Sequence, residues 1–77
     1  MNLGQTIKRA IEEVQYNHFI LLGVKPANDS YLAYVLVKRN TEYEPYVTWL
    51  YNSTGSGFNH GHYFTELNDA IIDFEKR

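Results

Sequence analysis

The chain has 77 residues, no cysteine, and a formal net charge of −2 from seven basic and nine acidic residues. The lack of cysteine excludes disulfides and thiolate zinc sites, and the lack of a basic excess argues against general binding to nucleic acid. There is neither a secretory signal pattern nor an apolar run of the ~20 residues that span a membrane, so we expect a cytoplasmic protein. The length predicts a single domain over residues 1–77.

The first half of the chain predicts one helix followed by two strands. Over residues 3–16 the apolar side chains recur at helical spacing, and Asn2 and Gln5 form a capping-box pattern at the start. Residues 19–24 are almost wholly apolar and predict a first strand. Residues 31–39 are apolar on both faces, which is typical of a central strand. Turn-forming residues separate the two strands.

The second half predicts a hairpin and a second helix. The β-branched and aromatic residues of 46–52 and 58–64 predict two strands, joined by the Gly- and Ser-rich loop 53–57. Thr65 is expected to cap a helix over residues 66–75. The predicted order of elements is therefore α-β-β-β-β-α.

These elements predict an α+β fold around a four-stranded antiparallel sheet, because consecutive strands with short connections favour a meander. We expect both helices to pack on one face of the sheet, each through its single apolar stripe. The other face is then either solvated or an interface. A small core and an uncovered face together predict a two-fold homodimer.

The predicted hairpin is the candidate functional region. It holds the only Trp, two of the three His, and several Tyr and Phe residues of the chain. Trp and Tyr are favoured anchors at protein interfaces, so the hairpin is predicted to bind a partner. Gly61 is expected to leave room for the ring of Trp49 across the hairpin. The candidate binding residues are Tyr46, Trp49, Tyr51, Phe58, His60, His62 and Tyr63.

The same hairpin contains residues that are typical of metal sites and of catalysis. His60 and His62 have the spacing of two residues on one face of a strand, a known metal-ligand geometry. A metal needs further ligands, and no acidic residue occurs between Glu44 and Glu66, so we predict no metal and no cofactor. The Ser residues of the 53–57 loop are ordinary turn chemistry. Without a convergent nucleophile, base and orienting group, the sequence predicts no enzyme.

Two other binding functions fit the aromatic residues. Exposed rings stack on the bases of single-stranded nucleic acid, but basic residues normally accompany them and are few here. A small nucleotide held between Trp49 and tyrosine rings needs fewer charges. A protein that sequesters a nucleotide signal is therefore the main alternative, and a single-stranded nucleic-acid-binding module is the third.

The segments Tyr43-Glu44-Pro45-Tyr46-Val47-Thr48-Trp49 and Gly61-His62-Tyr63-Phe64 resemble small uncharacterised proteins of Gram-positive phages and mobile elements. The similarity continues through Ala70 and Phe74 to Arg77 and covers roughly the C-terminal half. The resemblance implies a non-catalytic protein that antagonises host defence, in the manner of anti-CRISPR proteins. It identifies no catalytic residue. The leading hypothesis is an inhibitor that blocks a host defence protein through the aromatic hairpin and its sheet face.

Overall fold

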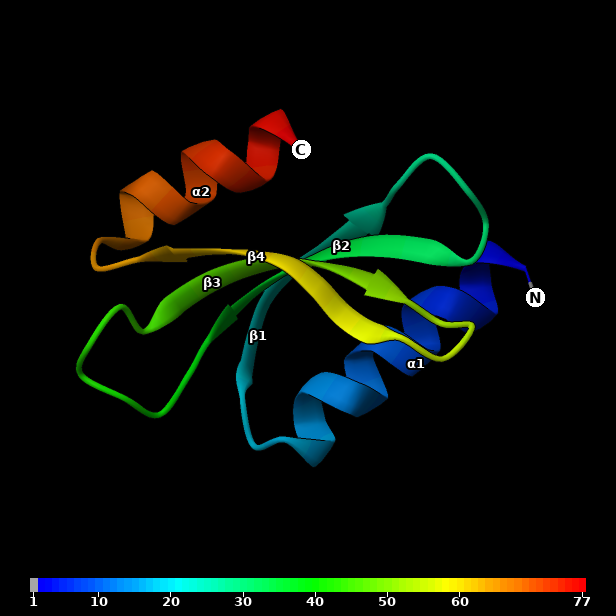
Figure 1. Ribbon diagram of the computed structural model, residues 1–77, viewed down its shortest axis with the longest axis horizontal. Helices are drawn as coiled ribbons and strands as arrows, with labels where there is room; N and C mark the ends of the chain where they lie inside the picture. The colour runs from blue at the N-terminus through cyan, green and yellow to red at the C-terminus, as the bar shows by residue number, and fades with distance from the viewer. Residues whose placement is uncertain (1) are drawn as a thin grey trace.

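The computed structural model describes residues 2–77 as one sheet and two helices. The elements are α1 (Leu3–Tyr16), β1 (Ile20–Pro26), β2 (Leu32–Lys38), β3 (Tyr46–Asn52), β4 (Gly57–Phe64) and α2 (Leu67–Lys76). The strands pair antiparallel in the order β1-β2-β3-β4 (Figure 1). The predicted class, element order and antiparallel meander are confirmed. Neither helix of the described residues has the length and apolar character that crossing a membrane requires.

Local sequence signals predict the ends of α1 correctly but place the start of α2 one residue too early. α1 begins and ends where predicted, and its capping box is complete: the Asn2 side chain accepts from the Gln5 N–H, and the Gln5 side chain accepts from the Asn2 N–H, both at 2.9 Å. α2 begins one residue later than predicted. Its N-cap is Glu66, whose side chain makes no capping bond, and not Thr65.

The two helices lie on opposite faces of the sheet, which corrects the expectation that they share one (Figure 1). Side chains alternate along a strand, so Val35 and Leu36 of β2 face opposite ways. α1 packs Ala10 into the cluster that contains Val35. α2 instead places Phe74 beside Gly23 and Leu36. Because β2 is apolar on both faces, one helix on each side removes more apolar surface from water than two on the same side.

Neither helix covers the whole of its face. We call the two faces the α1 side and the α2 side. α1 packs mainly on β1 and β2, whereas α2 packs on β2, β3 and β4. The surface left without a helix on the α1 side is therefore the part formed by β3 and β4. A homodimer was expected from a wholly uncovered face, whereas the uncovered part of the α1 side is limited to β3 and β4.

A buried polar contact ties α1 to the end of β3. The Thr6 hydroxyl is fully buried; it donates to the Ser30 carbonyl at 2.5 Å and lies 3.2 Å from the Ser53 hydroxyl. Ser53 in turn donates to the Tyr31 carbonyl at 2.8 Å. These bonds fix the beginning of α1 against the hairpin while its later turns stand over β1 and β2.

Candidate functional site

Four aromatic side chains cluster on the α1 side, and we call them the aromatic surface: Phe19, Trp49, Phe58 and Tyr63. Trp49 is the centre. Its ring stacks on Phe58 with centroids 4.8 Å apart, meets Tyr63 edge-on at 6.3 Å, and lies 5.5 Å from Phe19. Offset and edge-on pairs at such distances are favourable beyond their buried area. The rings are therefore held in one arrangement before any partner arrives.

The register of the hairpin explains why these rings meet. Trp49 and Tyr51 of β3 alternate onto the α1 side, and Tyr51 pairs with Phe58 of β4. A bulge in β4 lies opposite Trp49 and brings Gly61 under its indole ring. A Cβ at Gly61 would lie 2.7 Å from Trp49 Nε1 and 2.9 Å from the Tyr63 ring. The prediction that Gly61 makes room for Trp49 is confirmed.

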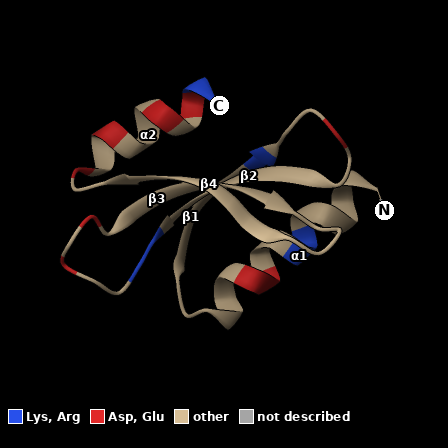
Figure 2. Cartoon of the chain, in the orientation of Figure 1, with Lys and Arg blue, Asp and Glu red and all other residues tan. Residues whose placement is uncertain are grey.

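The aromatic surface is partly open to solvent and carries no charge of its own. Tyr63 is 43% exposed, and Phe19, Trp49 and Phe58 are half-buried. Residues 46–65 contain no Lys, Arg, Asp or Glu, and Figure 2 shows β3 and β4 free of either charge. The nearest cation is the Arg39 guanidinium, 4.9 Å above the Tyr63 ring. Contiguous apolar surface of this kind is typical of interaction sites.

The structure divides the seven candidate binding residues among three places. Trp49, Tyr51, Phe58 and Tyr63 share the α1 side, with Tyr51 almost wholly buried. The other three, Tyr46, His60 and His62, do not join them. Tyr46 and His62 lie on the α2 side, and His60 is exposed at the bulge with a φ of 51°.

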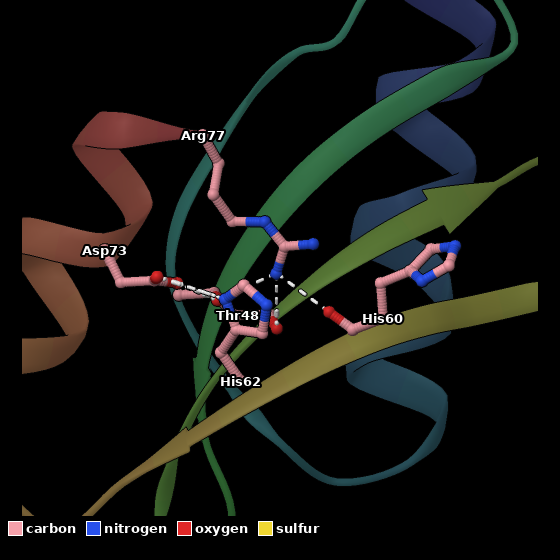
Figure 3. A network of polar contacts seen from close by, with 5 residues as sticks. All are labelled: Thr48, His60, His62, Asp73 and Arg77. Atoms are coloured by element: carbon pink, nitrogen blue, oxygen red, sulfur yellow. Dashed lines mark hydrogen bonds and ion pairs between the residues drawn. The ribbon is translucent and has the colours of Figure 1, made fainter.

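His62 belongs to a polar network on the α2 side (Figure 3). Its Nδ1 lies 3.0 Å from both carboxylate oxygens of Asp73 in α2. The Thr48 hydroxyl donates to the same carboxylate at 2.5 Å. Arg77 donates to the Thr48 carbonyl and hydroxyl and to the His60 carbonyl, at 2.9 to 3.1 Å. The network therefore fastens α2 to β3 and β4.

The pKa of Asp73 reflects this setting. Burial alone would raise the pKa, but the hydrogen bonds from Thr48 and His62 and the charges of His62 and Arg77 outweigh it, so the pKa is lowered from its usual value of 3.8. The geometry differs from that of a Ser–His–Asp triad, in which the hydroxyl bonds to the imidazole. Here the buried Thr48 hydroxyl bonds to the carboxylate, and the network has the form of a structural clamp.

The bulge also separates the two imidazoles. The His60 ring points away from the His62 ring and takes no part in the network, to which His60 contributes its carbonyl (Figure 3). Across residues 2–77, no group of three or more His, Asp or Glu side chains is arranged to hold a metal ion.

Sequence reasoning missed Phe19, Arg39 and the Asp73 network. Phe19 and Trp49 are far apart in the chain, and only the pairing of the strands brings them together. Arg39 follows β2, and its guanidinium lies over the Tyr63 ring while it donates to the Glu44 carbonyl at 2.8 Å. The sequence signals for Phe19 and Arg39 are those of a strand start and a strand end, and neither indicates a binding site.

Comparison of the chain with known protein families, with curated proteins and with solved structures finds no match.

Proposed function

We propose that this protein binds a partner protein through the aromatic surface, without catalysis, and that the partner is a host defence protein whose action it blocks. One observation carries the binding: a Trp ring is stacked and flanked by three other rings on an uncharged part of the sheet that no helix covers. The class of partner rests on the resemblance of the C-terminal half to proteins of phages and mobile elements.

The physical argument for binding is preorganisation. Trp, Tyr and Arg supply most interface energy, and the aromatic surface places Trp49 and Tyr63 beside Arg39. Binding costs less when side chains do not have to be ordered. Here Gly61 and the neighbouring rings already fix Trp49. A partner that covers these rings removes half-exposed aromatic surface from water at little entropic cost.

The test is capture of a partner from lysate of a Gram-positive bacterium with the purified protein and two variants. Tyr63→Ala removes an exposed ring and is expected to abolish capture. Ile72→Ala truncates a side chain of similar exposure on α2, 52% against 43%, and is expected to leave capture unchanged. One stoichiometric protein that is lost with Tyr63→Ala and retained with Ile72→Ala supports the proposal. Equal capture by all three forms contradicts it.

Denaturing the purified protein tests the main alternative. A nucleotide released in stoichiometric amount favours a protein that sequesters a nucleotide signal, and it contradicts the blocking function.

Self-association through the same aromatic surface stays a prediction. Light scattering at micromolar concentration checks it, because a monomer has a mass near 9.0 kDa. A dimer that dissociates on Tyr63→Ala would show that a second copy competes with the foreign partner for this surface.

A further inference from the structure

A groove of about 590 Å³ lies between α1 and the end of the β3–β4 hairpin. Ligand clefts commonly have volumes of about 300–1,000 Å³, so this groove is large enough for a side chain and its flanking backbone. One wall is a single stripe of α1 and the other is the hairpin end. The lining residues are Arg9, Glu12, Glu13, Tyr16, Tyr51, Asn52, Ser53, Gly55 and Gly57.

The α1 wall carries two acidic side chains that make no ion pair. Arg9, Glu12, Glu13 and Tyr16 follow the i, i+3, i+4, i+7 spacing and so face the groove together. The Arg9 guanidinium donates to the Ser53 carbonyl at 3.1 Å and closes one end of the groove. The two glutamates are exposed and make no ion pair among residues 2–77. Their negative potential is therefore available to a ligand.

Tyr51 supplies a polar group at the hairpin wall. Its side chain is 5% exposed, yet its hydroxyl has no hydrogen-bond partner within residues 2–77. Burial raises the pKa of Tyr51, the Glu13 carboxylate raises it further, and Arg9 opposes this. The hydroxyl is thus protonated at neutral pH and close to the acidic wall. Within residues 2–77 the one buried side-chain polar atom without a partner is Arg39 Nε, so the Tyr51 hydroxyl keeps access to water in the groove. A ligand atom in the groove would take the place of that water as its hydrogen-bond partner.

The hairpin end leaves the space open. Gly55 and Gly57 have φ values of 130° and 68°, and a Cβ at either position would meet no atom within 4 Å. Such φ values favour glycine, so the turn that the chain requires here also leaves these two positions of the wall without side chains. An extended segment can approach the backbone at this end of the hairpin.

We propose that the groove binds an arginine or lysine side chain in an extended basic segment of the partner protein. The carboxylates of Glu12 and Glu13 outnumber the Arg9 cation in the lining, so the groove has a net charge of −1, which attracts a cation and repels a phosphate or an acidic peptide. The groove lies next to the aromatic surface, since the Tyr51 ring that lines the groove is 5.4 Å from the Phe58 ring. The inference rests on the proposed function and adds the charge class of the segment that the partner presents.

The probe is the peptide acetyl-Gly-Arg-Gly-Arg-Gly-amide, titrated into the isotope-labelled protein at low salt. We expect saturable shifts of the backbone amide signals of Gly55 and Gly57 in NMR spectra. The same peptide with Glu in place of Arg should cause none. Raising the ionic strength should weaken binding, because screening acts on exposed charges. Identical shifts from both peptides, or none from either, would overturn the proposal.

Two double variants distinguish the effect of the groove glutamates on peptide affinity from the effect of the net charge of the protein. Glu12→Gln with Glu13→Gln should weaken peptide binding by roughly two- to thirty-fold, the range for two exposed ion pairs. The matched control, Glu66→Gln with Glu75→Gln, changes the net charge equally at exposed positions of the α2 region and should have no effect. If both double variants weaken binding equally, the peptide responds to overall charge, and a site in the groove is ruled out.

Tyr51→Phe tests the hydroxyl that lines the groove without removing the ring. We expect roughly a ten-fold loss of peptide affinity, which corresponds to the lower end of the range for one hydrogen bond to a charged group. Unchanged affinity would remove Tyr51 from the site.

Capture from lysate distinguishes the two proposals. A partner that needs Tyr63 but is captured equally well by the Glu12→Gln, Glu13→Gln form refutes the groove and leaves the proposed function intact. Peptide binding in the groove without any Tyr63-dependent partner supports the groove and refutes the proposed function.

Discussion

On its α1 side the β3–β4 hairpin presents aromatic rings, and on its α2 side the same two strands present a clamp of hydrogen bonds. Trp49 and Thr48 are neighbours in β3, yet one is packed by rings and the other by Asp73 and Arg77. The two sides also differ in cover, because α2 lies over β3 and β4 whereas α1 stands mainly over β1 and β2.

The difference indicates a division of labour within one hairpin. The clamp consists of hydrogen bonds, which require specific geometry, and it attaches α2 to the sheet. The α2 side of the hairpin is therefore already covered. The aromatic surface packs against the core cluster that contains Ala10 and Val14 of α1, and its rings remain partly accessible to solvent. Its stability comes from apolar packing, which depends little on pH, whereas the clamp contains titratable groups. Perturbing one side at a time should therefore give distinguishable responses.

The largest expected effect comes from removing the central ring. Trp49→Ala should lower the free energy of unfolding by about 2–3 kcal/mol, somewhat below the value for a fully buried Trp because the ring is half-buried. Urea denaturation monitored by circular dichroism measures it. The loss should be the same at neutral and at acidic pH. Tyr43→Ala removes a ring that is 76% exposed and outside the aromatic surface, and a loss of similar size there would contradict this interpretation.

Adding a single methyl group under the same ring should have the next largest effect. Gly61→Ala places a Cβ 2.7 Å from Trp49 Nε1, so we expect a loss of about 2 kcal/mol from overpacking. Thermal unfolding and the shift of the Trp49 indole signal in NMR spectra report it. Gly23→Ala is the matched change on the α2 side. Its Cβ would lie 3.1 Å from the Phe74 ring, and the longer distance predicts a smaller loss.

Much of the fold follows from local patterns in the sequence. The helical stripe and capping box defined α1, and alternation with a Gly-rich loop defined the hairpin and the role of Gly61. The face occupied by each helix was not predictable from one stripe, because a stripe indicates that a helix is amphipathic and carries no information on which side of the sheet it packs. The apolar character of both faces of β2 was the available signal.

The divided candidate site has a similar origin. A one-residue bulge in β4 breaks the alternation of side chains, so His60 and His62 do not act as a pair. The partners of His62 and Thr48 come from α2, and no spacing rule relates Asp73 to either of them. Long-range polar contacts of this kind depend on how the helix docks. The sequence therefore predicted the ring side of the hairpin better than the clamp side.

Breaking the clamp at its centre should have an intermediate effect that depends on pH. Asp73→Asn removes the charged acceptor shared by Thr48 and His62, and should cost about 1.5 kcal/mol at neutral pH. Because the pKa of Asp73 is lowered on folding, its contribution is present above the ordinary value of 3.8 and is lost as the pH falls through the lowered value. The gap between wild type and variant should therefore close in acid.

Urea denaturation of both forms at a series of pH values measures this gap. Asp69→Asn is the control, since it removes a carboxylate from the same helix that makes none of the clamp bonds. A gap that stays constant down to strongly acidic pH would show that the Asp73 charge does not stabilise the fold.

The smallest effect is expected from the imidazole of the clamp. The His62 side chain is 49% exposed, so its ion pair with Asp73 is solvent-screened, and His62→Gln should cost about 0.5 kcal/mol. Added salt should reduce that loss further, because screening weakens the pair in the wild type. His60→Gln provides the contrast: it leaves the backbone carbonyl that accepts from Arg77 in place and should change stability less than His62→Gln. Thermal unfolding at low and high salt measures both. If His60→Gln is the more damaging change, then the clamp depends more on the conformation at the bulge than on the imidazole–carboxylate pair. The bulge would then link the two sides of the hairpin, since it also holds Gly61 under Trp49.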